Sequence, residues 1–248
     1  MSNDYFQFKQ FLIQQANSGM KVTTDGCLFG AWVASEINAN AEPKKILDIG
    51  AGTGLLSLML AQATQQSQIE AVEINTSAFE EALSNFSDSK WSERLKIYQS
   101  PIQDFSVDST YDLILSNPPF FTDSQKGTID DKNQALHSSD LPMQALLKAV
   151  LALLSKDGTF YVLFPEREMD RFIELANKSQ LCLTESLEVR NQSGSKVFRK
   201  MAAFSFREKE FNQREIIIRK SDGRYTDEFW SLLEEFYLEY NDPYFKTF

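Results

Sequence analysis

The chain has 248 residues, 42% of them hydrophobic and 24% charged, with a formal net charge of −10. This is the composition of a globular protein that can bury a sizeable core, and no run of 18 apolar residues is present that could cross a membrane. Two cysteines and one histidine, in no metal-ligand spacing, argue against structural zinc and fit a reducing compartment. The first residues lack the basic start and apolar centre of a signal peptide, so we expect a cytoplasmic protein without a metal or a membrane partner.

The first 40 residues read as an extension ahead of the main pattern. Residues 5–15 form an aromatic-rich stretch that we expect to be a short element docked on the domain. Apolar residues between Leu28 and Ile37 recur with helical spacing and predict a helix that begins near Thr24 or Asp25.

From residue 45 the chain alternates between short apolar strands and helices. Such alternation implies right-handed crossovers and a parallel sheet with helices on both faces. The helix at 141–154 is expected to be followed by a turn at Asp157 and Gly158, which ends it. Strands are predicted at residues 46–49, 69–74, 95–98, 111–116 and 159–164, and helices at 55–61, 77–86, 141–154 and 166–178.

The pattern changes after residue 179. Residues 181–189 and 197–207 read as two strands of a hairpin, which adds an antiparallel strand to the sheet, and residues 216–218 extend it. Residues 226–240 read as a terminal helix. We therefore predict an α/β fold in a single domain over residues 1–248, with an extension and cap at 1–40, a core at 41–207 and a helical elaboration at 208–248.

A glycine-rich segment follows the first strand of the sheet, where an open α/β sheet binds its ligand. Gly50, Gly52 and Gly54 let a ligand approach the backbone and leave helix N–H groups exposed. A dinucleotide fingerprint would need Gly or Ala at position 55, where this chain has Leu55. Asp48 would repel a pyrophosphate and suits a ligand with a positive amino group. The segment therefore argues against a nicotinamide oxidoreductase.

Acidic residues also follow the next two strands. Glu73 is placed to accept hydrogen bonds from both hydroxyls of a ribose. Asp104, with Gln103 beside it, is placed to accept from the exocyclic amine of an adenine. Together with Asp48, this ordered set indicates an adenosine that carries a cationic amino-acid tail, which is S-adenosylmethionine.

The strand at 111–116 runs directly into Asn117, Pro118, Pro119 and Phe120. Proline has a fixed φ and no N–H, so the sheet cannot continue through these residues. The result is an amide side chain, free carbonyl groups and an aromatic face on a stiff loop, which suits a flat molecule with an amino group. Taken alone, the tetrapeptide is explained equally well as a strand that ends at two prolines in a turn, with no role in binding.

In combination these motifs resemble class I methyltransferases that methylate amino groups, over residues 20–207. The segments 20–26 and 225–229, together with Phe121 after the prolines, resemble the tRNA1(Val) (adenine-37-N6)-methyltransferase family. The resemblance implies a Rossmann-like class I fold, S-adenosylmethionine as methyl donor, and transfer of its methyl group to N6 of adenine 37 beside the anticodon. We expect a monomer whose partner is the anticodon loop of tRNA.

The resemblance also implies roles for individual residues. The Asn117 side-chain oxygen and the Pro118 carbonyl would accept the hydrogens of the amine, Asn117 would also border the cofactor, and Phe120 would stack on a flipped adenine. Further cofactor contacts over the site are implied for Lys21, Thr24 and Asp25. Weaker candidates for substrate contact are Phe121, His137, Arg199 and Lys200, and a solvent-exposed or locally bonded side chain stays open for His137.

Residues 190–224 hold ten basic and four acidic residues, a local balance of +6 in an acidic chain. This window is either a solvated strand surface or a surface that faces a polyanion. Other substrates also stay open. The glutamine N5-methyltransferases of release factors share the Asn-Pro-Pro-aromatic motif, usually with Tyr where this chain has Phe120, and guanine N2-methyltransferases of ribosomal RNA commonly have His where it has Phe121. A non-catalytic adenosine-binding protein is disfavoured by the intact Asn117 and glycine segment.

Overall fold

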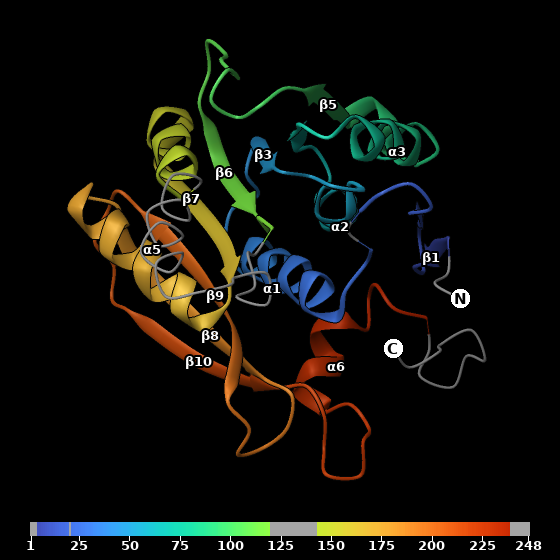
Figure 1. Ribbon diagram of the computed structural model, residues 1–248, viewed down its shortest axis with the longest axis vertical. Helices are drawn as coiled ribbons and strands as arrows, with labels where there is room; N and C mark the ends of the chain where they lie inside the picture. The colour runs from blue at the N-terminus through green and yellow to red at the C-terminus, as the bar shows by residue number, and fades with distance from the viewer. Residues whose placement is uncertain (1–3, 20, 120–142, 239–248) are drawn as a thin grey trace, which may run out of the picture.

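The computed structural model describes residues 4–19, 21–119 and 143–238, which are built around an eight-stranded sheet (Figure 1). The strands are β3 (Lys45–Ile49), β4 (Gln68–Glu73), β5 (Leu95–Gln99), β6 (Tyr111–Ser116), β7 (Leu154–Phe164), β8 (Cys182–Arg190), β9 (Val197–Ser205) and β10 (Asn212–Ile217), in the order β10-β8-β9-β7-β6-β3-β4-β5. Strands β7, β6, β3, β4 and β5 are parallel, and β9 runs antiparallel to both β7 and β8. The predicted parallel sheet with a late antiparallel hairpin is confirmed.

Helices cover both faces of the sheet because its central strands are apolar on both faces. On β6, Leu113 and Leu115 belong to one buried cluster and Ile114 belongs to the other. The first cluster lies under α1 (Thr24–Ala39), α2 (Leu55–Ala63), α3 (Thr76–Ser87) and α6 (Asp227–Leu233), and the second lies under the helix at residues 143–153 and α5 (Glu166–Lys178). This two-sided burial is what near-continuous apolar strands require.

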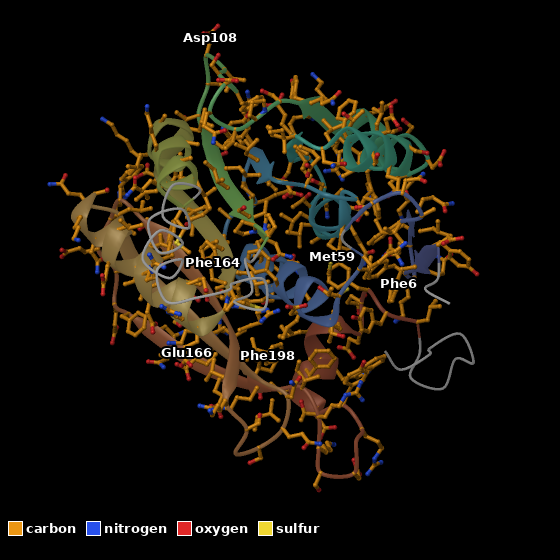
Figure 2. All side chains as sticks on the ribbon, viewed as in Figure 1. Phe6, Met59, Asp108, Phe164, Glu166 and Phe198 are labelled. Atoms are coloured by element: carbon orange, nitrogen blue, oxygen red, sulfur yellow. The ribbon has the colours of Figure 1, made fainter. Side chains whose placement is uncertain are left out.

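Helix α1 begins where the sequence pattern predicts it. Thr23 is the N-cap, and its side-chain oxygen accepts from the Gly26 N–H at 3.2 Å. Further along, a Cβ placed on Gly30 would lie 2.6 Å from the Met59 sulfur, so glycine allows α1 to pack closely on α2 (Figure 2). This packing places the amino end of α1 at the carboxyl edge of the sheet.

The amino-terminal segment contacts the segment that follows α6. Residues 5–15, predicted as one short element, form the hairpin of β1 (Tyr5–Gln7) and β2 (Leu12–Gln14). The Lys9 N–H donates to the carbonyl oxygen of Phe236 at 2.8 Å, which joins this hairpin to the chain after α6. The region from residue 208 onward contributes strand β10 as well as the helix α6. The predicted boundaries at residues 40 and 207, between extension, core and elaboration, stay a proposal.

Two predicted boundaries are wrong for tertiary reasons. The strand predicted from residue 159 begins at Leu154, directly after the helix that ends at residue 153, because Leu154 already pairs with Tyr111 across a register shift at the start of β7. The terminal helix α6 ends at Leu233 rather than near residue 240. After it the chain turns, which buries the side chains of Phe236 and Tyr237 against the first cluster.

Gly54, at the start of α2, offers a test of the close packing in this layer. Its φ is +83°, and a Cβ at this position would collide with the buried ring of Phe86. We expect Gly54→Ala to lower the free energy of unfolding by about 2–5 kcal/mol, from backbone strain and from displacement of the ring. Gly194 is the matched control, because its φ is +76° but nothing lies within 4 Å of an added Cβ. Gly194→Ala should cost only about 1–2 kcal/mol in chemical denaturation, and equal losses would contradict the packing argument.

Candidate active site

The glycine segment and Asn117 lie side by side at the carboxyl edge of the sheet. Their strands β3 and β6 are neighbours, with Ile49 paired to Ser116. The buried Ser116 hydroxyl also donates to the Ile49 carbonyl oxygen at 2.8 Å. Because Gly50 follows Ile49 and Asn117 follows Ser116, this bond holds the two predicted motifs in contact.

The glycine segment leaves open space above its backbone. Gly50 and Gly52 have φ of +73° and +56°, and an added Cβ at either would meet no atom of the described residues within 4 Å. The Gly50 N–H donates to the Val72 carbonyl at 2.8 Å, which fastens the segment to β4. A ligand can therefore approach this backbone closely, as the sequence predicts.

Asp48 is fully buried beneath the glycine segment. Its Oδ2 accepts from the Ser57 hydroxyl at 2.8 Å and from the Ser57 N–H at 3.2 Å, whereas its Oδ1 has no partner among the described residues. Burial, with nearby Glu73 adding to it, raises the pKa of Asp48 to about 7 despite the Ser57 bonds. A buried acceptor without a donor is costly, so the site fits a ligand that brings a positive amino group.

Glu73, at the end of β4, is held by two backbone groups. Its Oε2 accepts from the Gly52 N–H and its Oε1 from the Asn75 N–H, both at 2.8 Å. Each oxygen keeps a further lone pair, which matches the predicted pair of ribose hydroxyls. Ile74 follows, with 66% of its side chain exposed. Sequence reasoning overlooked Ile74, although a large apolar residue directly after a strand-end acid is a signal for an apolar ligand surface.

Asn117 lies against the first turn of α1. A Cβ placed on Gly26 would be 3.7 Å from Asn117 Nδ2, and it would also be 3.6 Å from a methyl group of Leu55. The Asn117 Oδ1 atom is buried and has no hydrogen-bond partner in the described parts of the chain. Pro118 is half-buried and Pro119 exposed. An amide acceptor thus remains unpaired next to the open glycine segment.

The remaining predicted cofactor residues are spread more widely. Thr24 and Asp25 form the first turn of α1, and the Lys21 ammonium donates to the carbonyl oxygen of Gln15. Gln103 and Asp104 are exposed in a turn that follows β5, where the Asp104 N–H donates to Pro101 at 3.0 Å. Cofactor contact at these positions stays a prediction.

The predicted substrate residues have different outcomes. Arg199 pairs with Asp25 at 2.7 Å, and Lys200 pairs with Asp170 at 3.0 Å and with Glu166 at 3.6 Å. Both cations are engaged in ion pairs with side chains of the protein, which disfavours them as phosphate contacts. Their contact with the substrate stays a prediction. Phe120, Phe121 and His137, for which substrate contact is also predicted, lie outside the described residues.

Asn85 supports the site and was not predicted. This buried residue of α3 donates to the Thr53 carbonyl at 2.9 Å and to the Gln14 carbonyl at 3.0 Å, and it accepts from the Gln14 N–H at 2.8 Å. It therefore joins the glycine segment to the amino-terminal hairpin. The available signal was a polar residue four positions after Glu81, on the face of α3 that also presents Ala82 and Phe86 to the core.

Within the described ranges, no group of three or more His, Cys, Asp or Glu side chains is placed to hold a metal ion. Nor does any helix of those ranges have both the length and the apolar composition to span a bilayer.

Asp48 generates a prediction about pH. Because its folded pKa of about 7 lies above the ordinary value of 3.8, its contribution favours the folded state below pH 4 and is lost as pH rises through 7. For the ligand-free protein, Asp48→Asn should therefore gain stability relative to wild type between pH 4 and 8, by up to about 4 kcal/mol. The same variant should bind S-adenosylmethionine about 10–100-fold more weakly at pH 8, since a charge-assisted hydrogen bond is lost.

Thermal unfolding across pH and calorimetric titration check the two effects. Asp108→Asn is the control, because Asp108 is exposed in the loop ahead of β6, at the opposite edge of the sheet (Figure 2). A stability difference that does not change with pH would contradict the assignment of the buried charge to Asp48.

Comparison with known proteins agrees with this geometry. The Methyltransferase small domain family matches residues 31–164. A tRNA1(Val) (adenine(37)-N6)-methyltransferase from Flavobacterium psychrophilum is 40% identical over 94% of this chain and 99% of its own length. In fold, the chain is similar to a protein described as a predicted O-methyltransferase from Agrobacterium tumefaciens (TM-score 0.65, 12% identity, 84% of this chain and 95% of that one). It is also similar to the glycopeptide N-methyltransferase MtfA in complex with S-adenosylmethionine (TM-score 0.52, 11% identity, 71% and 93%). The chain belongs to the tRNA1(Val) (adenine(37)-N6)-methyltransferase family, and its fold is that of the class I methyltransferases.

Proposed function

We propose that this protein transfers the methyl group of S-adenosylmethionine to the N6 amine of adenine 37 in tRNA1(Val), in the anticodon loop. The observation that carries the proposal is the buried Asn117 Oδ1, which has no hydrogen-bond partner among the described residues and is held beside the glycine segment by the Ser116–Ile49 bond. The name and the near-complete overlap of the Flavobacterium relative support the choice of substrate. Release factors and ribosomal RNA, the other substrates considered, are not favoured by that relative.

The residues around the glycine segment fit the methyl donor. Asp48 Oδ1 would accept from its amino group, Glu73 from its ribose hydroxyls, and exposed Ile74 would cover an adenine face. Asp104 and Gln103 would contact the adenine edge, while Lys21, Thr24 and Asp25 would close the site from the amino-terminal side. When bound, S-adenosylmethionine supplies an electrophilic methyl group on a positively charged sulfur.

The chain's own contribution to the chemistry is to hold the amine. The lone pair of an exocyclic adenine amine is delocalised into the ring, so this nitrogen is a poor nucleophile. Asn117 Oδ1 and the Pro118 carbonyl would each accept one N–H hydrogen, which favours tetrahedral geometry at nitrogen and localises the lone pair. Because both acceptors sit on a loop stiffened by Pro118 and Pro119, they act by positioning and electrostatics. The methylated amine is acidic and can release its proton to solvent without a dedicated base.

The adenine would have to leave the anticodon loop to reach Asn117. Phe120 would stack on the flipped base, which is worth about 1–3 kcal/mol, and Phe121 and His137 would contact neighbouring groups. We further propose that the protein acts as a monomer in the cytoplasm, where its tRNA substrate is found.

The variant Asn117→Ala tests the assigned role directly. It should lower the rate of methyl transfer at least 100-fold, because one of two amine acceptors is removed, and it should leave the affinity for S-adenosylmethionine within about threefold. Single-turnover transfer of radiolabelled methyl groups and calorimetry measure the two quantities. An Asn117→Ala protein that keeps its rate would show that the amide does not hold the amine.

The substrate is tested by offering the wild-type protein unmodified tRNA, ribosomal RNA and release factor with radiolabelled S-adenosylmethionine. Label is expected in tRNA, at N6 of adenine 37 by mass spectrometry of the nucleosides. Label confined to protein or to ribosomal RNA would overturn the proposed substrate.

A further inference from the structure

Two loops leave the sheet at the same edge as Asn117. Lys200 of β9 pairs with Phe164, the last residue of the parallel strand β7, so the residues that precede Lys200 extend past that edge. The loop at 191–196 joins β8 to β9, and the loop at 218–226 follows β10, whose Ile217 pairs with Arg190. Both loops project from the lower end of the sheet in Figure 1, and Figure 2 shows Phe198 at that end and Asp108 at the other.

The two loops form one surface. The Ile218 N–H donates to the Arg190 carbonyl, and the Arg219 N–H donates to the Asn191 carbonyl, both at 2.9 Å. We call residues 191–196 and 218–226 the two-loop rim. It contains Lys196, Arg219, Lys220, Arg224 and one acid, Asp222, so the rim carries +3 in a chain whose net charge is −10.

The cations of the rim differ from the other basic residues between positions 190 and 224 in their ion pairing. Lys196 is exposed, and neither it nor Arg219 has a carboxylate partner among the described residues. The Arg219 guanidinium donates to the Gly223 carbonyl at 2.8 Å and lies 4.6 Å from the centre of the Tyr225 ring, contacts that position the cation without neutralising it.

The other two rim cations, Lys220 and Arg224, pair with Asp227 and Asp222 on the open surface. Exposed pairs of this kind are held loosely, so a phosphate can replace the carboxylate. By contrast, Arg199 and Lys200 are ion-paired in less exposed positions on the strand behind the rim.

The rim is also fixed relative to the reaction site. The Arg199–Asp25 ion pair, at 2.7 Å, fastens β9 to the first turn of α1, and Gly26 in that turn adjoins Asn117. Along the sheet, β9 is two strands from β6 and β10 is four strands away. Ala202 of β9 is level with Ser116 through Val162, so the rim begins six residues further along β9, at Lys196. With roughly 4.8 Å between strands and 3.3 Å per residue, the rim begins about 20–25 Å from Asn117, a distance that several nucleotides span.

We propose that the two-loop rim binds backbone phosphates of tRNA next to the nucleotide held at Asn117, with Lys196 and Arg219 as its main contacts. This assignment rests on the proposed function, since it needs a tRNA whose target base enters the site. It also explains how a protein with a net charge of −10 can bind a polyanion: the rim has a local excess of positive charge, and two of its cations, Lys196 and Arg219, have no carboxylate partner among the described residues.

The test compares wild type with Lys196→Gln/Arg219→Gln and with a control of equal charge change, Lys44→Gln/Lys96→Gln. Lys44 and Lys96 are exposed near the amino ends of β3 and β5, at the opposite edge of the sheet. Affinity for unmodified tRNA is measured by fluorescence anisotropy over a series of salt concentrations. Thermal unfolding and calorimetry with S-adenosylmethionine verify that each variant is folded.

We expect the rim variant to bind tRNA about tenfold more weakly at low salt, with a slope of log affinity against log salt that is shallower by about 1.5, as the loss of two phosphate contacts predicts. The control should match wild type in both quantities. Methyl transfer at saturating tRNA should be unchanged in the rim variant, because its residues hold RNA and not the amine.

The outcomes separate the two proposals. If wild type methylates tRNA and the rim variant equals the control, the rim is not a tRNA contact and the proposed function stands. If wild type neither binds nor methylates tRNA, the proposed function fails. If the Arg219 substitution unfolds the protein, Lys196→Glu alone, in an exposed loop, should still weaken binding more than Lys44→Glu, and equality of those two would overturn the rim proposal.

Discussion

The site depends on the parallel register of β3 and β6, in which Ile49 lies opposite Ser116. Each strand ends at a residue that cannot continue the ladder in the usual way, a glycine at positive φ in one case and an Asn-Pro-Pro turn in the other. Because both faces of β6 are buried under helices, a slip of one residue would move Leu113, Ile114 and Leu115 into the opposite clusters and disrupt the packing on both faces. The Ser116 hydroxyl adds a direct bond at the point where both strands stop. The glycine segment and Asn117, which we propose as the donor site and the amine site, are therefore neighbours.

The polar groups that we propose for ligand binding at this edge lower the stability of the ligand-free protein. Asp48 and Asn117 each have a buried oxygen that finds no hydrogen-bond partner in the described parts of the chain. Unpaired buried acceptors destabilise a fold, and they are tolerated where a ligand supplies the missing donor. Ser57 limits the cost at Asp48, because its two hydrogen bonds satisfy the other oxygen and hold the carboxyl group in one orientation. Stability and ligand affinity are thus expected to change in opposite directions at Asp48.

For the binding of a polyanion, the positions of the charges matter more than the net charge of −10. Most basic residues between positions 190 and 224 pair with acids, several of which come from distant parts of the chain: Arg199 with Asp25, Lys200 with Asp170, and Arg214 with Glu36 at 2.5 Å. These pairs tie the late strands to α1 and α5. Lys196 and Arg219, which have no carboxylate partner among the described residues, lie on the two-loop rim. The basic window therefore divides into a part that stabilises the fold and an exposed part.

The sequence by itself determined the order and type of the core elements and the position of the site motifs. Local signals carried this information: glycines at the end of an apolar strand, acids after successive strands, and the N-cap at Thr23 all act on residues close in the chain. Boundaries were decided by tertiary packing where the local signal was weak, as at residue 153, where Leu154 pairs with Tyr111, and at the end of α6, where Phe236 and Tyr237 turn into the core. Only the tertiary structure could show that Asn85 holds the glycine segment, that Ser57 orients Asp48, or that Asp25 neutralises Arg199. Asn85 bonds to Thr53 and Gln14, 32 and 71 positions away, and Arg199 bonds to Asp25, 174 positions away. No periodicity in the sequence encodes which distant group will satisfy a buried polar side chain.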